Sequence, residues 1–86
     1  MAQVLDMLQA FFEEHKILAY HDSYWSHLYI ETPAGKIQIE AFDAVVSGYI
    51  CISIWLDRRY PKDVQELSLY DPECFPKMLE YVRKYS

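Results

Sequence analysis

Glycine is scarce in this chain of 86 residues, which contains only Gly35 and Gly48. A phosphate-binding loop and a dinucleotide-binding fingerprint each need several glycines at fixed spacings, so the sequence excludes both. The same scarcity excludes the glycine-flanked turn that presents a serine nucleophile in many hydrolases. The glycine count therefore argues against enzymes that depend on any of these three motifs.

Basic residues, long apolar runs and cysteines are also few. Eight Lys and Arg face thirteen Asp and Glu, giving a net charge of −5, whereas a general nucleic-acid binder needs an excess of bases. No apolar run reaches the roughly 18 residues that cross a bilayer, so we expect no membrane association. The two cysteines, Cys51 and Cys74, are fewer than a small secreted domain usually carries, so we expect free thiols and a cytoplasmic protein.

Hydrophobic periodicity predicts a helix at each end of the chain and strands between them. Apolar residues recur at spacings of three and four over residues 2–15, as in an amphipathic helix. Alternation predicts strands over 24–32, 36–46 and 49–56, preceded by a short strand at 17–20. Residues 64–70 fit either a strand or a helix. A final helix is expected over 76–85, starting at Pro76 because a proline deeper in a helix clashes with the preceding turn.

The predicted fold class is therefore α+β. A four- or five-stranded antiparallel sheet carries the N-terminal and C-terminal helices, in a single domain over residues 1–86. Two helices packed on one face of this sheet leave its other face to the solvent or to the chain's own loops.

Aromatic and acidic residues are what the sequence has in excess. Eight Tyr, four Phe and two Trp make the chain 16% aromatic, and all of the net charge lies in residues 1–43. Alternation places several aromatic residues on the strand faces opposite the predicted core, and an exposed aromatic patch usually marks an interface. The predicted protein-binding residues are Glu13, Glu14, Trp25, Tyr29, Glu31, Glu40, Asp43 and Trp55.

These features favour a non-enzymatic, acidic protein-binding module. We expect an inhibitor or adaptor that docks on the basic surface of a nucleic-acid-handling protein and is able to form a homodimer. A small, acidic, aromatic-rich domain without catalytic motifs is similar in general profile to phage-encoded anti-defence inhibitors, including anti-CRISPR proteins. This similarity is one of type and rests on no particular residues.

An alternative is a small metal- or ligand-binding enzyme that uses His21, His27 and Cys74. Cys74 lies near a predicted helix N-terminus, where a thiolate is stabilised. The two histidines flank a predicted turn and could face each other across it, but the close-spaced pairs typical of zinc sites are missing. We expect no catalytic set, metal or cofactor, and retain His21 and His27 as candidate ligands.

A second alternative is a nucleic-acid contact through Arg58, Arg59, Tyr60 and Lys62, the basic cluster of the chain. Arginine beside an aromatic ring can stack on bases and bind phosphate. Because the protein is acidic overall, we instead expect these bases to pair with neighbouring acids in a loop.

Overall fold

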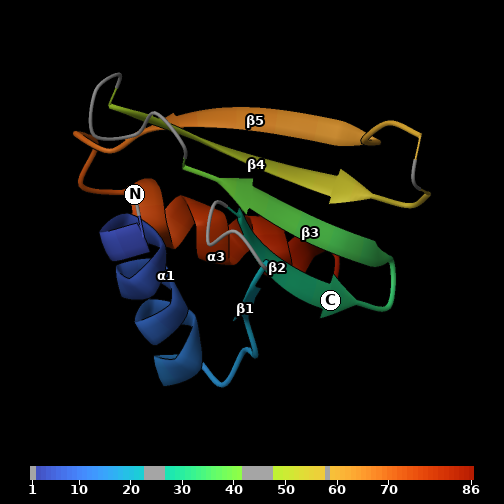
Figure 1. Ribbon diagram of the computed structural model, residues 1–86, viewed down its shortest axis with the longest axis horizontal. Coiled ribbons are helices and arrows are strands. Elements are labelled where there is room, and N and C mark those ends of the chain that lie inside the picture. Colours follow the sequence, from blue (N-terminus) through green and yellow to red (C-terminus); the bar gives the residue numbers. More distant parts are fainter. Residues whose placement is uncertain (1, 23–26, 42–47, 58) are drawn as a thin grey trace.

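Five strands lie between two helices along the chain, in the α+β arrangement expected from the sequence (Figure 1). The structure is a computed structural model that describes residues 2–22, 27–41, 48–57 and 59–86. Its elements are α1 (Ala2–Glu14), β1 (Tyr20–His21), β2 (His27–Thr32), β3 (Gly35–Glu40), β4 (Tyr49–Trp55), β5 (Asp63–Ser68) and α3 (Cys74–Lys84).

The strands form one antiparallel sheet in the order of the sequence, β1-β2-β3-β4-β5. Its register runs continuously across the middle strands, with Leu28 opposite Ile39 and Ile39 opposite Ile52. Side chains alternate between the two faces of a strand, and residues paired across strands share a face. The register therefore decides which residues of the whole sheet lie together.

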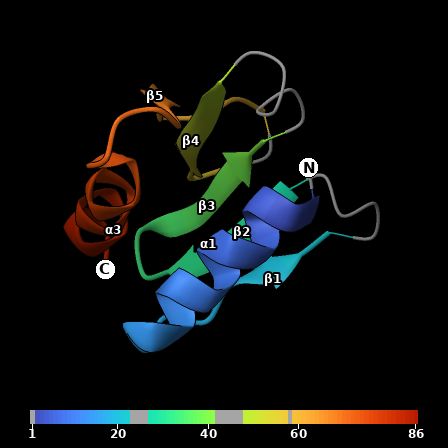
Figure 2. The same ribbon diagram turned by 90° about the vertical axis from the view of Figure 1, so that its left-hand side faces the viewer.

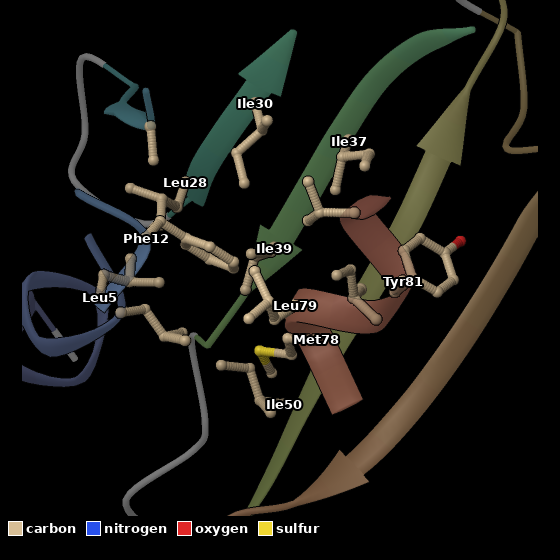
Figure 3. Close-up of a cluster of buried hydrophobic side chains, with 14 of the residues drawn as sticks. Leu5, Phe12, Leu28, Ile30, Ile37, Ile39, Ile50, Met78, Leu79 and Tyr81 are labelled. Carbon is tan, nitrogen blue, oxygen red and sulfur yellow. The ribbon is translucent and has the colours of Figure 1, made fainter. Parts of the chain in front are cut away.

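One face of the sheet carries the hydrophobic core. The alternate residues of β2, β3 and β4 on this face are aliphatic and nearly inaccessible, and Leu5, Phe12 and Met78 of the helices are equally buried. Figure 3 shows these side chains converging between the sheet and the two helices. The sheet residues of the core are Leu28, Ile30, Ile37, Ile39, Ile50, Ile52 and Ile54.

Each helix covers a different part of this face (Figure 2). The Gln9 side chain donates to the Ala19 carbonyl at 2.8 Å and so fixes α1 beside the β1 end of the sheet. The Tyr81 hydroxyl donates to the Asp63 carbonyl at 3.3 Å and fixes α3 beside β5. The helices meet through Phe11 and Phe75, whose ring centroids lie 5.4 Å apart. Together they occupy the core side of the sheet and leave its other side uncovered by either helix.

The predicted first helix is confirmed, and its end has a clear cause. Its apolar stripe is buried, with Leu5, Leu8 and Phe12 fully inaccessible. Lys16 adopts a positive φ of 62°, which turns the chain out of the helix. The Phe12 carbonyl then accepts the amide of Ile17 at 2.9 Å, in the manner of a helix C-terminal cap.

Near the C-terminus the structure settles one open expectation and corrects another. Residues 64–70, left open between strand and helix, contribute to strand β5, which pairs with β4 over six positions. The last helix begins at Cys74, two residues before the expected start at Pro76. The expectation was wrong because Pro76 falls in the first turn, where amide groups have no partner within the helix and a missing N–H costs nothing.

The strands expected over 24–32 and 36–46 correspond to β2 and β3. All of their described residues except Ala41 are in a strand, and β3 starts one residue earlier than expected, at Gly35. Residues 23–26 and 42–47 lie outside the described part of the chain. Within the described part, no helix is long and apolar enough to cross a membrane.

Candidate protein-binding face

The sheet face opposite the helices is the candidate site, and we call it the open face. Neither of the described helices packs on it, and the pairing registers place on it every second residue of each strand. It carries aromatic, polar and acidic side chains in place of the aliphatic ones of the core. Its residues are Tyr20, His27, Tyr29, Glu31, Lys36, Gln38, Glu40, Tyr49, Cys51, Ser53, Trp55, Val64, Glu66 and Ser68.

One end of the open face is a contiguous group of aromatic and charged side chains. Tyr20 and Tyr29 are paired across β1 and β2, with ring centroids 5.7 Å apart. The Tyr20 hydroxyl donates to Glu31 at 2.5 Å, and this hydrogen bond raises the pKa of Tyr20 to about 12. Lys36 lies 3.8 Å from the same carboxylate and 5.1 Å from the centre of the Tyr29 ring. A cation is thus held between a carboxylate and an aromatic ring.

Trp55 completes this end from β4. Its indole N–H donates to the Ser53 hydroxyl at 3.0 Å, and Ser53 in turn donates to the Gln38 carbonyl at 3.4 Å. Ser53 is only 7% exposed although it lies on the open face. The polar edge of the indole is therefore satisfied within the protein, and the ring is oriented before any partner arrives.

A hollow of about 550 Å³ opens between these side chains. It lies across the ends of β2, β3 and β4 and extends to the two residues after β4. Its volume is within the range of sites that hold a ligand or a partner's side chain. We call it the Trp55 hollow; its lining residues are Tyr29, Glu31, Lys36, Gln38, Trp55, Leu56 and Asp57.

The other end of the open face is acidic. The register aligns Glu40, Cys51 and Glu66 across three neighbouring strands. Burial raises the pKa of the Cys51 thiol, and the two carboxylates raise it further. This thiol stays protonated at neutral pH, as its position in an apolar strand predicts. Its environment suits a packed side chain and does not activate a nucleophile.

The predicted protein-binding residues fall into two layers. Tyr29, Glu31, Glu40 and Trp55 lie together on the open face. Glu13 and Glu14 are exposed at the end of α1, in the layer on the opposite side of the sheet. Trp25 and Asp43 lie outside the described residues.

Sequence reasoning missed Tyr20, Val64 and Glu66 as members of the open face. Strand β1 has only two residues, too few for an alternation pattern, and the register of β5 was not predictable while residues 64–70 stayed ambiguous. The sequence did offer one signal: Val64 and Glu66 are two positions apart and fall on the strand face opposite that of the apolar Leu67.

The residues of the enzyme alternative are not brought together on one surface. His21 pairs with Leu28, a core residue, and so lies on the core side of the sheet. His27, which directly precedes Leu28 in β2, lies on the open face. His21 lies 3.1 Å from Asp6 of α1, and His27 lies 3.4 Å from Asp22. Within the described residues, no three His, Cys, Asp or Glu side chains are grouped so that they could hold a metal.

Cys74 also differs from its expected role. It is the first residue of α3, but only 3% of it is exposed because it packs into the core. Burial raises the pKa of its thiol, so the expectation of a stabilised thiolate was wrong. Desolvation disfavours the charged thiolate, and the nearby Asp71 carboxylate raises the pKa of Cys74 further.

The basic cluster occupies the connection between β4 and β5, at the border of the Trp55 hollow. Asp57 accepts the backbone amide of Arg59 at 2.8 Å, which orders the start of this loop. Tyr60 is 69% exposed, and the Lys62 amide bonds the Ile54 carbonyl where the next strand begins. Arg58 lies outside the described residues.

Comparison of the chain with protein-family models, with curated proteins and with solved structures gave no match.

Proposed function

We propose that this protein is a non-enzymatic binding module that docks through its open face on a basic surface of another protein. As an inhibitor or adaptor, it would cover a surface that handles nucleic acid. The observation that carries this proposal is the contrast between the two faces of the sheet. One face is filled by the helices, whereas the other presents aromatic rings and carboxylates that neither described helix covers.

The exposure of apolar groups on the open face supports a protein partner. Tyr49 and Val64 are 52% and 54% exposed, and Leu56 beside the Trp55 hollow is 54% exposed. Tyr and Trp contribute most of the binding energy in many interfaces because they bury a large area at little entropic cost. Such residues on an uncovered sheet are therefore favourable anchors for docking.

The charge of the open face supports a basic partner. Glu31, Glu40 and Glu66 are exposed on three different strands, and Lys36 is the only Lys or Arg among the open-face residues. Complementary charge accelerates the encounter of two proteins and disfavours partners of the same sign. A surface that binds nucleic acid has the complementary positive potential.

Photo-crosslinking tests which layer of the protein meets the partner. A photoreactive phenylalanine analogue replaces Tyr49 on the open face or Met7 on α1, positions with similar exposure of 52% and 56%. We expect one defined protein to be captured in the native host from position 49 and not from position 7. Capture from position 7 alone would contradict docking through the open face.

Charge reversal tests the electrostatic part of the proposal with the captured protein. We expect Glu40→Lys with Glu66→Lys to slow association about tenfold or more at low ionic strength, with the difference shrinking in salt. Glu13→Lys with Glu14→Lys makes the same charge change on α1 and should have a much smaller effect. Equal effects of the two pairs would show that only net charge matters.

A further inference from the structure

We propose that the Trp55 hollow is a receptor for an arginine side chain of the basic partner. This inference rests on the proposed function and specifies the contact at its centre. The hollow combines an indole ring, a phenol ring and two carboxylates within one depression of the sheet. Aromatic faces and carboxylates are the groups that bind guanidinium, by stacking and by paired hydrogen bonds.

Lys36 indicates that this end of the open face accommodates a cation. Its ammonium group lies 3.8 Å from Glu31 and 5.1 Å from the Tyr29 ring centre, so the protein's own side chain makes the contacts that an incoming cation would make. Lys36 is nevertheless on the exposed edge of the site, with about half of its side chain accessible. It is able to move aside when a partner's side chain enters.

The charge balance of the hollow leaves room for one further cation. Glu31 and Asp57 carry two negative charges, whereas Lys36 carries one positive charge. Glu31 is 61% exposed, so an incoming guanidinium can reach it. Among the residues that line the hollow, a phosphate or carboxylate ligand would meet two carboxylates and a single ammonium group, which disfavours an anion there.

Arginine fits this site better than lysine because of Trp55. The indole N–H is already bonded to Ser53, so the polar edge of the ring needs no partner from an incoming side chain. Guanidinium is planar and weakly hydrated and stacks on an aromatic face, whereas ammonium is compact and strongly hydrated. The ring of Trp55 thus favours arginine, while the carboxylates favour any cation.

Tryptophan fluorescence provides a direct test with defined probes, hexaarginine and hexalysine peptides. The variant Trp25→Phe serves as the background throughout, so that Trp55 is the only tryptophan of the chain. We expect hexaarginine to change the Trp55 emission at low salt and to bind more tightly than hexalysine. Glu31→Gln should weaken hexaarginine binding about fivefold, the effect of one exposed ionic contact. Glu80→Gln on α3 makes the same charge change at an exposed position outside the open face and should leave the affinity unaltered.

Removal of the internal cation tests the role of Lys36. We expect Lys36→Met to tighten hexaarginine binding more than Lys84→Met, which makes the same charge change on α3. Weaker binding by Lys36→Met, or equal tightening by both variants, would overturn the assignment of the site.

Two results distinguish failure of the hollow from failure of the proposed function. If calorimetric titration shows that Glu31→Gln and Glu66→Gln weaken hexaarginine binding equally while the Trp55 emission is unaltered, the open face binds cations diffusely and the arginine site is wrong. If Glu13→Lys with Glu14→Lys slows association with the captured protein and Glu40→Lys with Glu66→Lys does not, docking through the open face is itself wrong.

Discussion

At the scale of single residues, the two glycines each lie too close to a neighbour to carry a side chain, but the neighbours differ. A Cβ atom at Gly35 would lie 2.5 Å from the carbonyl oxygen of Trp55, because β3 approaches the end of β4 closely there. A Cβ atom at Gly48 would lie 2.4 Å from the ring of Tyr70, and the residue has a φ of +77°. The ring of Tyr70 is 82% exposed and can rotate away, whereas a carbonyl of the sheet cannot move alone.

We therefore expect Gly35→Ala to destabilise the protein more than Gly48→Ala. The first should cost up to ~3 kcal/mol, because it forces backbone strain between paired strands. The second should cost ~1 kcal/mol, the penalty of a left-handed conformation for alanine. Urea unfolding of the two variants measures the difference, with Gly48→Asn as a control that tolerates positive φ. A larger loss for Gly48→Ala would contradict this account.

At the scale of elements, the start of α3 is fixed by one aspartate and by the position of one proline. Asp71 accepts the Glu73 amide at 2.9 Å and the Lys77 ammonium at 2.7 Å, and the bond from Lys77 holds the pKa of Asp71 below its usual value. The Lys77 amide then bonds the Glu73 carbonyl at 2.8 Å and begins the helical ladder. Pro76 directly precedes this first bonded amide, so it interrupts nothing.

Moving the proline by one residue should therefore have a large effect. Lys77→Pro removes the first ladder bond and should cost ~3 kcal/mol of the free energy of unfolding. Pro76→Ala should cost less than ~1 kcal/mol, through the greater freedom of the unfolded chain alone. Lys77→Ala separates the loss of the ion pair with Asp71 from the effect of the proline. Chemical denaturation of the three variants provides the measurement, and similar losses for Lys77→Pro and Lys77→Ala would refute the argument.

At the scale of the whole molecule, the acidic half of the sequence does not form one acidic surface. Glu13 and Glu14 belong to α1, whereas Glu31 and Glu40 lie on the far side of the sheet. Acidic residues of the first half therefore face both sides of the sheet.

Phenols and thiols with raised pKa values are also distributed over both sides of the sheet. The hydrogen bond to Glu31 raises the pKa of Tyr20, and burial raises the pKa of further groups: Tyr29, Cys51, Cys74 and Tyr81.

These shifts predict a loss of stability in alkaline solution. In the unfolded chain the thiols ionise near 9.0 and the phenols near 10.0, before they ionise in the folded protein. The contribution of these groups to stability is therefore complete below pH 9.0 and declines as the pH rises through the raised values. We expect the Tm to fall as the pH rises above 9.0.

Tyr81→Phe tests the origin of this decline. The variant should lose ~1 kcal/mol at neutral pH with the hydrogen bond to Asp63, and its Tm should then fall less steeply at high pH. An unaltered slope would show that Tyr81 does not contribute to the alkaline transition.

Much of the fold follows from the pattern of the sequence. The spacing of Leu5, Leu8 and Phe12 defines the buried side of α1, and the alternation of Ile50, Ile52 and Ile54 defines the core face of β4. These patterns are local consequences of helix and strand geometry, so they can be read without knowing any partner segment. The expected order of the two helices and the first four strands is accordingly the one observed, and residues 64–70, which the pattern left open, contribute to the fifth strand.

The candidate site could be predicted only in part. Alternation placed Tyr29 and Trp55 on the face opposite the core, but it could not place Lys36 between the carboxylate of Glu31 and the ring of Tyr29. That arrangement depends on the register of β2, β3 and β4, which is set by turn geometry and packing. The alternation of the strands also did not show that Glu13 and Glu14 lie in another layer.

The sequence by itself thus determined the two amphipathic helices, the three central strands and the aliphatic core, because each depends on spacing within one segment. Only the tertiary structure decided that Cys74 is desolvated and that the Trp55 hollow joins residues from three strands. The physical reason is that burial and electrostatic contact depend on distances between segments, which local periodicity does not encode.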